Sequence, residues 1–152
     1  MGIVVDIGCG SYCRGDVCID LNPFDTRITP HLDRFVGFSR NPDGMYIVAD
    51  AHMLPLRSGI ASYVLAIHVI EHCDHPAKVL REAMRILEPS GTIIVEVPNP
   101  RKNPADWVDR THIYSWTIAS LENMLRYIGF DDVLCTTVHH DDDVQCRARK
   151  YG

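Results

Sequence analysis

The sequence predicts an α/β protein built on a doubly wound, mostly parallel β-sheet that ends in a C-terminal antiparallel hairpin. Three observations lead to this fold class. Apolar runs of strand length alternate with helical patterns, these runs are continuously apolar, and the last two flank the polar turn "HHDDD". Continuous apolar runs are typical of strands buried on both faces of a parallel sheet. The 152 residues fit a single domain, residues 1–152, without repeats or linkers.

Five apolar runs account for the parallel part of the sheet. They cover residues 3–7, 17–21, 46–49, 62–67 and 92–97. The first run is rich in β-branched residues, which favour strands, and a Gly-Cys-Gly turn follows it. Asp50 ends the third run, and Pro98 stops the fifth because proline cannot donate to a sheet ladder.

Two helices are predicted between and after these runs. Asp74 is the expected N-cap of the first, Pro76 lies in its first turn, and apolar residues recur at helical spacing until residues 89–91 end it. The second helix runs over residues 117–128, with Gly129 as its C-cap. Residues 130–138 and 144–151 then form the hairpin.

Charge and hydropathy argue against several classes of function. The net charge of −5, without a basic track, argues against a nucleic-acid partner, since phosphate contacts need clustered Lys and Arg. No apolar run approaches the ~20 residues that span a bilayer. The N-terminus also lacks a signal-peptide pattern. We therefore expect no membrane span and a cytoplasmic location.

The six cysteines contain no C-x-x-C pair, which argues against a structural zinc ribbon. In a cytoplasmic chain we expect all six to be reduced. Cys18 and Cys135 lie within strand-like runs and are expected to be small buried hydrophobic residues.

Two motifs follow the first two strands, at the edge where α/β sheets bind ligands. The stretch "DIGCG", residues 6–10, has glycines that let the backbone approach a ligand, although a plain turn would also explain them. A nicotinamide fingerprint would need a third glycine where Cys13 stands. Asp20 can accept both hydroxyls of a ribose, or else it is a turn-forming residue before Asn22 and Pro23.

Two further clusters follow the third and fourth strands. Asp50, with Ala51 and His52, can accept an adenine amine, or else it is a helix N-cap or turn residue. The stretch "HVIEHCDH", residues 68–75, is rich in metal-ligating residue types. Its first histidine ends a strand and its last begins a helix, so the spacing does not imply that these side chains meet at one ion. We therefore expect no metal.

A long loop at residues 99–116 follows the fifth strand and is rich in proline, aromatic and charged residues. Its length and composition suit a flap over an active site, and a plain surface connection is the alternative.

Together these pieces resemble the class I S-adenosylmethionine-dependent methyltransferases, and the methyltransferase type 11 group in particular. The resemblance rests on "VVDIGCG", "CIDLNP", "VADAHMLPLRSGIASYVLAIHVIEH", "LREAMRILEPSGTIIVEVP" and "HIYSWTIASLENMLRYIGF", which follow the family's order over most of the chain. It implies a Rossmann-like methyltransferase fold and S-adenosyl-L-methionine as the cofactor.

The resemblance also assigns roles to matching positions. The glycine turn would lie under the methionine part of the cofactor, Asp20 would hold the ribose, and Asp50 would face the adenine amine. His68 falls where the family's fourth strand passes the transferred methyl. The implied cofactor-binding residues are Asp6, Gly8, Cys9, Gly10, Asp20, Leu21, Asp50, Ala51, His52 and His68.

The sequence departs from the family pattern in two places. Only nine residues separate Gly10 from Asp20, too few for the usual crossover helix. The chain also begins at the first strand, without the N-terminal helices that usually cover the cofactor, so the expected fold is reduced at the N-terminus. We expect cover from residues 24–44, where "HLDRFVGF" is a candidate short helix, from the partner in a homodimer, or from the acceptor.

The expected function is methyl transfer from S-adenosylmethionine to a small-molecule acceptor, on oxygen or carbon. A hydroxyl acceptor needs a base, and His112 and His68 are the candidates because imidazole titrates near neutral pH. Trp107 or Trp116 could face the sulfonium or an apolar acceptor. The alternatives are a non-catalytic S-adenosylmethionine-binding scaffold and a protein that binds another adenine nucleotide in the same loops.

Overall fold

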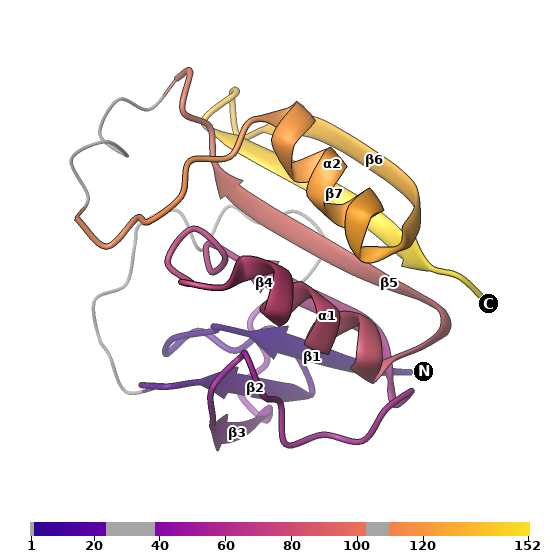
Figure 1. The fold of residues 1–152 in the computed structure, drawn as a ribbon. Coiled ribbons are helices and arrows are strands. Elements are labelled where there is room, and N and C mark those ends of the chain that lie inside the picture. Colours follow the sequence, from indigo (N-terminus) through magenta and orange to yellow (C-terminus); the bar gives the residue numbers. More distant parts are fainter. Residues whose placement is uncertain (1, 24–38, 103–109) are drawn as a thin grey trace.

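The computed structural model of the protein describes residues 2–23, 39–102 and 110–152. They form one seven-stranded sheet in the order β3-β2-β1-β4-β5-β7-β6 (Figure 1). The strands are β1 (Ile3–Ile7), β2 (Val17–Asp20), β3 (Met45–Val48), β4 (Ala61–Ile67), β5 (Leu87–Pro98), β6 (Phe130–Val138) and β7 (Asp143–Lys150). β1 to β5 pair in parallel, and β7 lies antiparallel between β5 and β6. This confirms the predicted fold class. The candidate short helix at residues 31–38 and Trp107 lie outside the described residues.

β1 and β4 lie side by side at the centre of the sheet, where the direction of strand addition reverses. From β1 the chain builds outward through β2 to β3, and from β4 it builds the other way through β5. Open α/β sheets bind ligands at such a reversal, outside the carboxyl ends of the strands. The topology therefore points to the ends of β1, β2 and β4.

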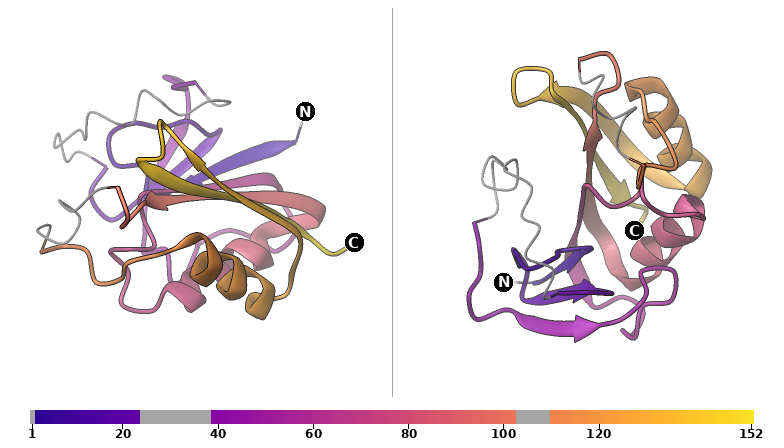
Figure 2. Two further views of the ribbon diagram at one scale, coloured as in Figure 1. Left: turned by 90° about the horizontal axis from the view of Figure 1, so that it is seen from above. Right: turned by 90° about the vertical axis from the view of Figure 1, so that its left-hand side faces the viewer.

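Two helices, α1 (Pro76–Ile86) and α2 (Ile118–Ile128), pack side by side on one face of the sheet (Figure 2). Both have the predicted helical spacing of apolar residues. Their buried apolar residues include Val79, Leu80, Ala83, Ile86, Leu121 and Leu125. Among the residues that the structure describes, no helix is long and apolar enough to cross a membrane.

The sequence predicts the end of α2 correctly but not the start of α1. Gly129 ends α2 in the left-handed conformation at a φ of 109°, as predicted, and Thr117 caps its start. α1 starts after His75, whose side chain makes no capping bond, so the prediction of Asp74 as N-cap is wrong. The Asp74 carboxylate instead pairs with His52 Nε2 at 3.0 Å.

β5 begins at Leu87, directly after α1, instead of at residue 92. Leu87 pairs with Ala61, and the register with β4 shifts before regular pairing resumes. Ser90 adopts a φ of 66° within this shift. Residues 89–91 therefore form an irregularity inside the strand, because the chain can pair with β4 on both sides of them.

As predicted, a short loop connects β1 and β2 in place of the usual crossover helix. Residues 8–16 are enough because the two parallel strands share only three register pairs, so the return path is short. The Tyr46 hydroxyl of β3 accepts from the Cys13 amide and donates to the Ser11 carbonyl, each at 3.1 Å. These bonds tie the loop to the sheet.

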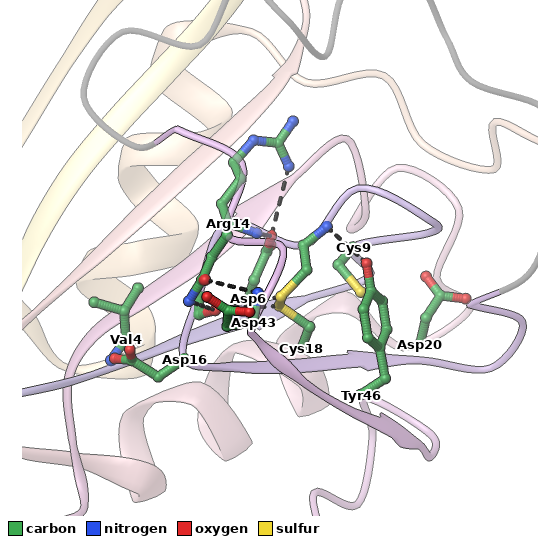
Figure 3. Close-up of a disulfide and its surroundings, with 12 residues drawn as sticks. Val4, Asp6, Cys9, Arg14, Asp16, Cys18, Asp20, Asp43 and Tyr46 are labelled. Carbon is green, nitrogen blue, oxygen red and sulfur yellow. Dashed lines mark hydrogen bonds and ion pairs between the residues drawn. A yellow bond between two sulfur atoms is a disulfide. The ribbon is translucent and has the colours of Figure 1, made fainter.

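Four cysteines form disulfides. Cys13 of the β1–β2 loop is bonded to Cys18 of β2 (Figure 3), and Cys135 is bonded to Cys146 across the β6–β7 hairpin. The prediction that all six cysteines are reduced is therefore wrong for these four. Spacing along the sequence does not reveal the pairs, because Cys135 and Cys146 meet only as register partners on adjacent strands.

Candidate functional site

A cavity of about 600 Å³ opens at the carboxyl ends of β1, β2 and β4. Its volume is within the roughly 300–1,000 Å³ of small-molecule sites. Of the cofactor-binding residues predicted from the sequence, those that line it are Gly8, Asp20, Leu21, Asp50, Ala51, His52 and His68. Asp6, Cys9 and Gly10 do not line it. The structure thus brings most of the predicted set together at one place.

Several further residues line the cavity that the sequence pattern did not assign to cofactor binding. Val69 and Cys73 belong to the turn after β4, Lys78 to the first turns of α1, and Ile113 to the segment before α2. The predicted strand order was the signal that could have found Val69 and Cys73, because a turn that leaves β4 at the reversal point must border the cavity.

Asp20 is held in place by the glycine turn and by its own loop. Its Oδ2 accepts a hydrogen bond from the Gly10 amide at 2.8 Å, and its Oδ1 accepts one from the Asn22 amide at 2.7 Å. Each carboxylate oxygen can accept more than one hydrogen bond. Asp20 is therefore oriented at the cavity wall and keeps capacity for a ligand. Gly10 thus orients the carboxylate and does not line the cavity itself.

We expect Gly8→Ala to destabilise the protein far more than Gly10→Ala. Both glycines have positive φ, 66° and 54°, which strains an alanine. A Cβ at Gly8 would also lie 2.4 Å from Val69 Cγ2, whereas one at Gly10 meets no atom within 4 Å. Urea unfolding should show losses of about 3 and about 1 kcal/mol, respectively. Adding Val69→Ala should partly restore the stability of the Gly8→Ala variant. Equal losses of stability for the two glycine variants would contradict this account.

Asp6, in β1 before the glycine turn, is fully buried and lies beside Arg14 (Figure 3). Its Oδ2 accepts from the Arg14 amide at 2.9 Å and lies 3.6 Å from Arg14 Nη1, while Oδ1 has no hydrogen-bond partner among the described residues. Burial raises the pKa of Asp6 to about 6, although the Arg14 charge opposes the shift. Burial likewise raises the pKa of the Cys9 thiol. Both residues support the turn from inside the protein.

Asp50 and His52 form a compact pair after β3. The Asp50 Oδ1 accepts from the His52 amide at 2.8 Å and contacts His52 Nδ1 at 2.6 Å. The hydrogen bonds from His52 lower the pKa of Asp50, so its carboxylate is charged at neutral pH. The pair presents a fixed acceptor beside the ends of β2 and β3.

His68 directly follows β4, has a φ of 54° and lies among three carboxylates. Its Nδ1 is 3.4 Å from Glu71 Oε1, and its Nε2 is 3.6 Å from Glu96 Oε1 and 3.5 Å from Asp143 Oδ1. Burial lowers its pKa, but the Glu71, Glu96 and Asp143 carboxylates beside the ring outweigh this and raise it to about 10. At neutral pH the ring is a charged donor, which does not suit a general base.

His112 is just outside the cavity, in the segment that leads into α2. Its ring packs edge-on against His72, with centroids 4.6 Å apart. The amides of Ile113 and Tyr114 donate to the Glu71 carbonyl at 2.7 and 3.2 Å, which fixes this segment to the turn after β4. Trp116 is 6% exposed and belongs to the hydrophobic core, so it does not face the cavity.

Comparison with known proteins places this architecture among methyltransferases. Ajmaline N-methyltransferase of Rauvolfia serpentina is 29% identical over 105 residues, covering 60% of this chain and 34% of that protein. A probable S-adenosylmethionine-dependent methyltransferase of Mycobacterium tuberculosis is 26% identical over 161 residues, covering 98% of this chain and 56% of that protein. The chain thus spans between a third and just over half of the length of these relatives.

Solved structures share the fold at lower identity. A SAM-dependent methyltransferase from Archaeoglobus fulgidus superposes with a TM-score of 0.70 at 18% identity, over 97% of this chain and 85% of that one. A chain in the complex of the Haloferax volcanii Trm112 methyltransferase activator with a putative methyltransferase gives 0.76 at 16% identity, over 98% and 82%. The family profile described as "Methyltransferase domain" matches residues 2–135. This chain, with a glycine turn after β1 and a cavity where the strand order reverses, therefore belongs to the methyltransferase domain family.

Proposed function

We propose that this chain binds S-adenosyl-L-methionine in the cavity and transfers its methyl group to a small-molecule acceptor. The observation that most supports the proposal is the convergence of three neighbouring strand ends. Gly8 follows β1, Asp20 ends β2 and Asp50 follows β3, and all three line one cavity. The family to which the chain belongs agrees with this assignment.

The residues present fit this cofactor. Charged carboxylates only accept hydrogen bonds, and an adenosine offers ribose hydroxyls and an exocyclic amine as donors. In our proposal Asp20 holds the ribose, and Asp50 holds the amine with Leu21 and Ala51 beside the ring. Gly8 exposes bare backbone to the methionine part, at a position where a Cβ cannot fit.

When bound, the cofactor supplies a methyl group already activated on a sulfonium. The protein therefore has mainly to align the acceptor and to exclude water. We assign His68 to donating hydrogen bonds at the end of β4, because both of its ring nitrogens face carboxylates. His112 lies farther out, toward the space that an acceptor would enter.

The acceptor is proposed to be a small molecule methylated on oxygen or carbon. Two relatives are named as N-methyltransferases of ajmaline and norajmaline, so nitrogen acceptors also belong in the screen. The net charge of −5 favours acceptors without phosphate groups.

Calorimetry should show binding of S-adenosylmethionine and S-adenosylhomocysteine, and much weaker binding of NAD and ATP. NAD is expected to bind weakly because the turn lacks the third glycine of the dinucleotide fingerprint, and ATP because the net charge of −5 disfavours its phosphates. Transfer of a labelled methyl group to fractionated metabolites would then identify the acceptor. A folded sample that binds neither of the first two ligands would refute the proposal. Binding without transfer to any acceptor class would favour the non-catalytic scaffold.

A further inference from the structure

We propose that Glu71, His72 and His112 form a site for one divalent metal ion at the rim of the cavity. Glu71 and His72 belong to the turn after β4, and His112 belongs to the segment before α2. One ligand atom from each residue lies within 4.8 Å of the other two. The sequence predicts no such meeting, because about forty residues separate the two segments.

The Glu71 carboxylate is the observation that points to a ligand. Its side chain is 1% exposed, and neither oxygen has a hydrogen-bond partner among the described residues. His68 Nδ1 lies 3.4 Å from Oε1 and His72 Nε2 lies 3.8 Å from it, both longer than an ordinary hydrogen bond. The charged His68 ring compensates Glu71 only in part, because it also faces Glu96 and Asp143. A buried carboxylate without hydrogen bonds is costly unless its charge is compensated, so Glu71 can accept a further cation.

His72 is oriented as a metal ligand. Its Nδ1 lies 3.1 Å from both the carbonyl oxygen and the hydroxyl oxygen of Thr111, and a ring N–H can donate to either of them. With the proton on Nδ1, the neutral ring keeps a lone pair on Nε2, the atom that faces Glu71. Metal-bound histidines typically make this bond to a backbone carbonyl through the nitrogen that does not bind the metal.

A second cluster of possible ligands, His68, Glu96 and Asp143, lies close by but is already paired. Glu96 Oε2 accepts from Gln145 Nε2 at 2.8 Å, and Oε1 lies 3.2 Å from His139 Nε2. The His68 ring fills the space between the carboxylates. The geometry therefore favours the cluster at Glu71 over this one.

Two imidazoles and one carboxylate suit first-row ions such as Mn²⁺, Fe²⁺, Co²⁺ or Zn²⁺ and leave coordination positions open. His72 also lines the cavity, so these positions would face a ligand bound there. An acceptor with a hydroxyl group could bind the ion through its oxygen, which would lower the pKa of that hydroxyl. This last role rests on the proposed function, whereas the metal site itself does not. His112 would then hold the ion instead of acting as a base.

Mn²⁺ is the probe of choice, because it prefers carboxylate and imidazole to the thiols of Cys9 and Cys73. Untagged protein should bind one equivalent of Mn²⁺ in calorimetry without any cofactor, and the Mn²⁺ resonance in electron paramagnetic spectra should lose intensity. Glu71→Gln and His72→Ala should each weaken binding by about 100-fold or more. His75→Ala is the matched control, since this exposed histidine lines the same cavity but lies outside the cluster, and it should bind like the wild type.

His72→Ala removes an exposed side chain, so it separates ligand loss from any folding defect of Glu71→Gln. No Mn²⁺ binding by wild-type protein, or wild-type Mn²⁺ affinity in both Glu71→Gln and His72→Ala, would overturn the metal site. S-adenosylmethionine binding, measured in parallel without metal, reports on the proposed function alone. Each of the two proposals can therefore fail while the other stands.

Discussion

Asp20→Ala is expected to weaken the binding of S-adenosylmethionine and S-adenosylhomocysteine by about 10- to 100-fold. The proposed hydrogen bonds from the ribose hydroxyls go to a charged acceptor, and such bonds contribute more than neutral ones. The Asp20 carboxylate also accepts from the Gly10 and Asn22 amides and so holds the glycine turn in place. The substitution removes this acceptor as well. Calorimetric dissociation constants for the wild type and the variant measure the effect.

The matched control for this variant is Asp16→Ala. Asp16 precedes the other end of β2, does not line the cavity, and accepts a hydrogen bond from the Val4 amide at 2.9 Å. Asp16→Ala removes the same charge beside the opposite end of β2, so its affinity for both ligands should match that of the wild type. Asp20→Asn, which keeps one acceptor oxygen, should fall between the wild type and Asp20→Ala. Unchanged affinity in a folded Asp20→Ala protein would remove the ribose assignment.

Arg14→Leu is expected to cost about 3–5 kcal/mol of stability at pH 7.5, because it leaves the Asp6 carboxylate buried without its counter-ion. Both side chains are 1% exposed, so water cannot compensate the lost pair. Denaturant titrations at pH 7.5 and pH 5 measure the loss. At pH 5 the loss should be much smaller, since Asp6 then holds a proton and carries no charge to leave unpaired.

The sign follows from the raised pKa of Asp6, about 6 in the folded protein against an ordinary value of 3.8. Below pH 3.8 the Asp6 carboxyl is protonated in both the folded and the unfolded protein. Between these values only the folded state holds the proton, so stability falls as the pH rises, by about 3 kcal/mol in total from this group. The Asp6→Asn/Arg14→Leu double variant should lose this dependence. A loss in Arg14→Leu that is equal at both pH values would contradict the account.

The sequence predicts the parallel strands well because each is a continuous apolar run, which is typical of parallel strands, although the edge strand β3 is largely exposed. It also predicts that Asp20 and Asp50 meet, because the carboxyl ends of parallel strands share one edge of the sheet. It does not predict the direction of Asp6, because β1 is buried on both of its faces and either side can receive a polar group. It misplaces the start of α1 because a fixed φ at Pro76 suits that start without a side-chain cap.

The sequence by itself determined the fold class, which polar residues follow each parallel strand, and most residues of the candidate cofactor cavity. All of these depend on local patterns and on chain direction. Only the tertiary structure decided which distant side chains meet. The Cys135–Cys146 bond depends on hairpin register. The Asp6–Arg14 pair depends on how the short β1–β2 loop folds back. The cluster at Glu71 depends on backbone hydrogen bonds that hold a later segment against the end of β4. Such contacts are set by packing over long sequence separations, and local sequence patterns do not encode them.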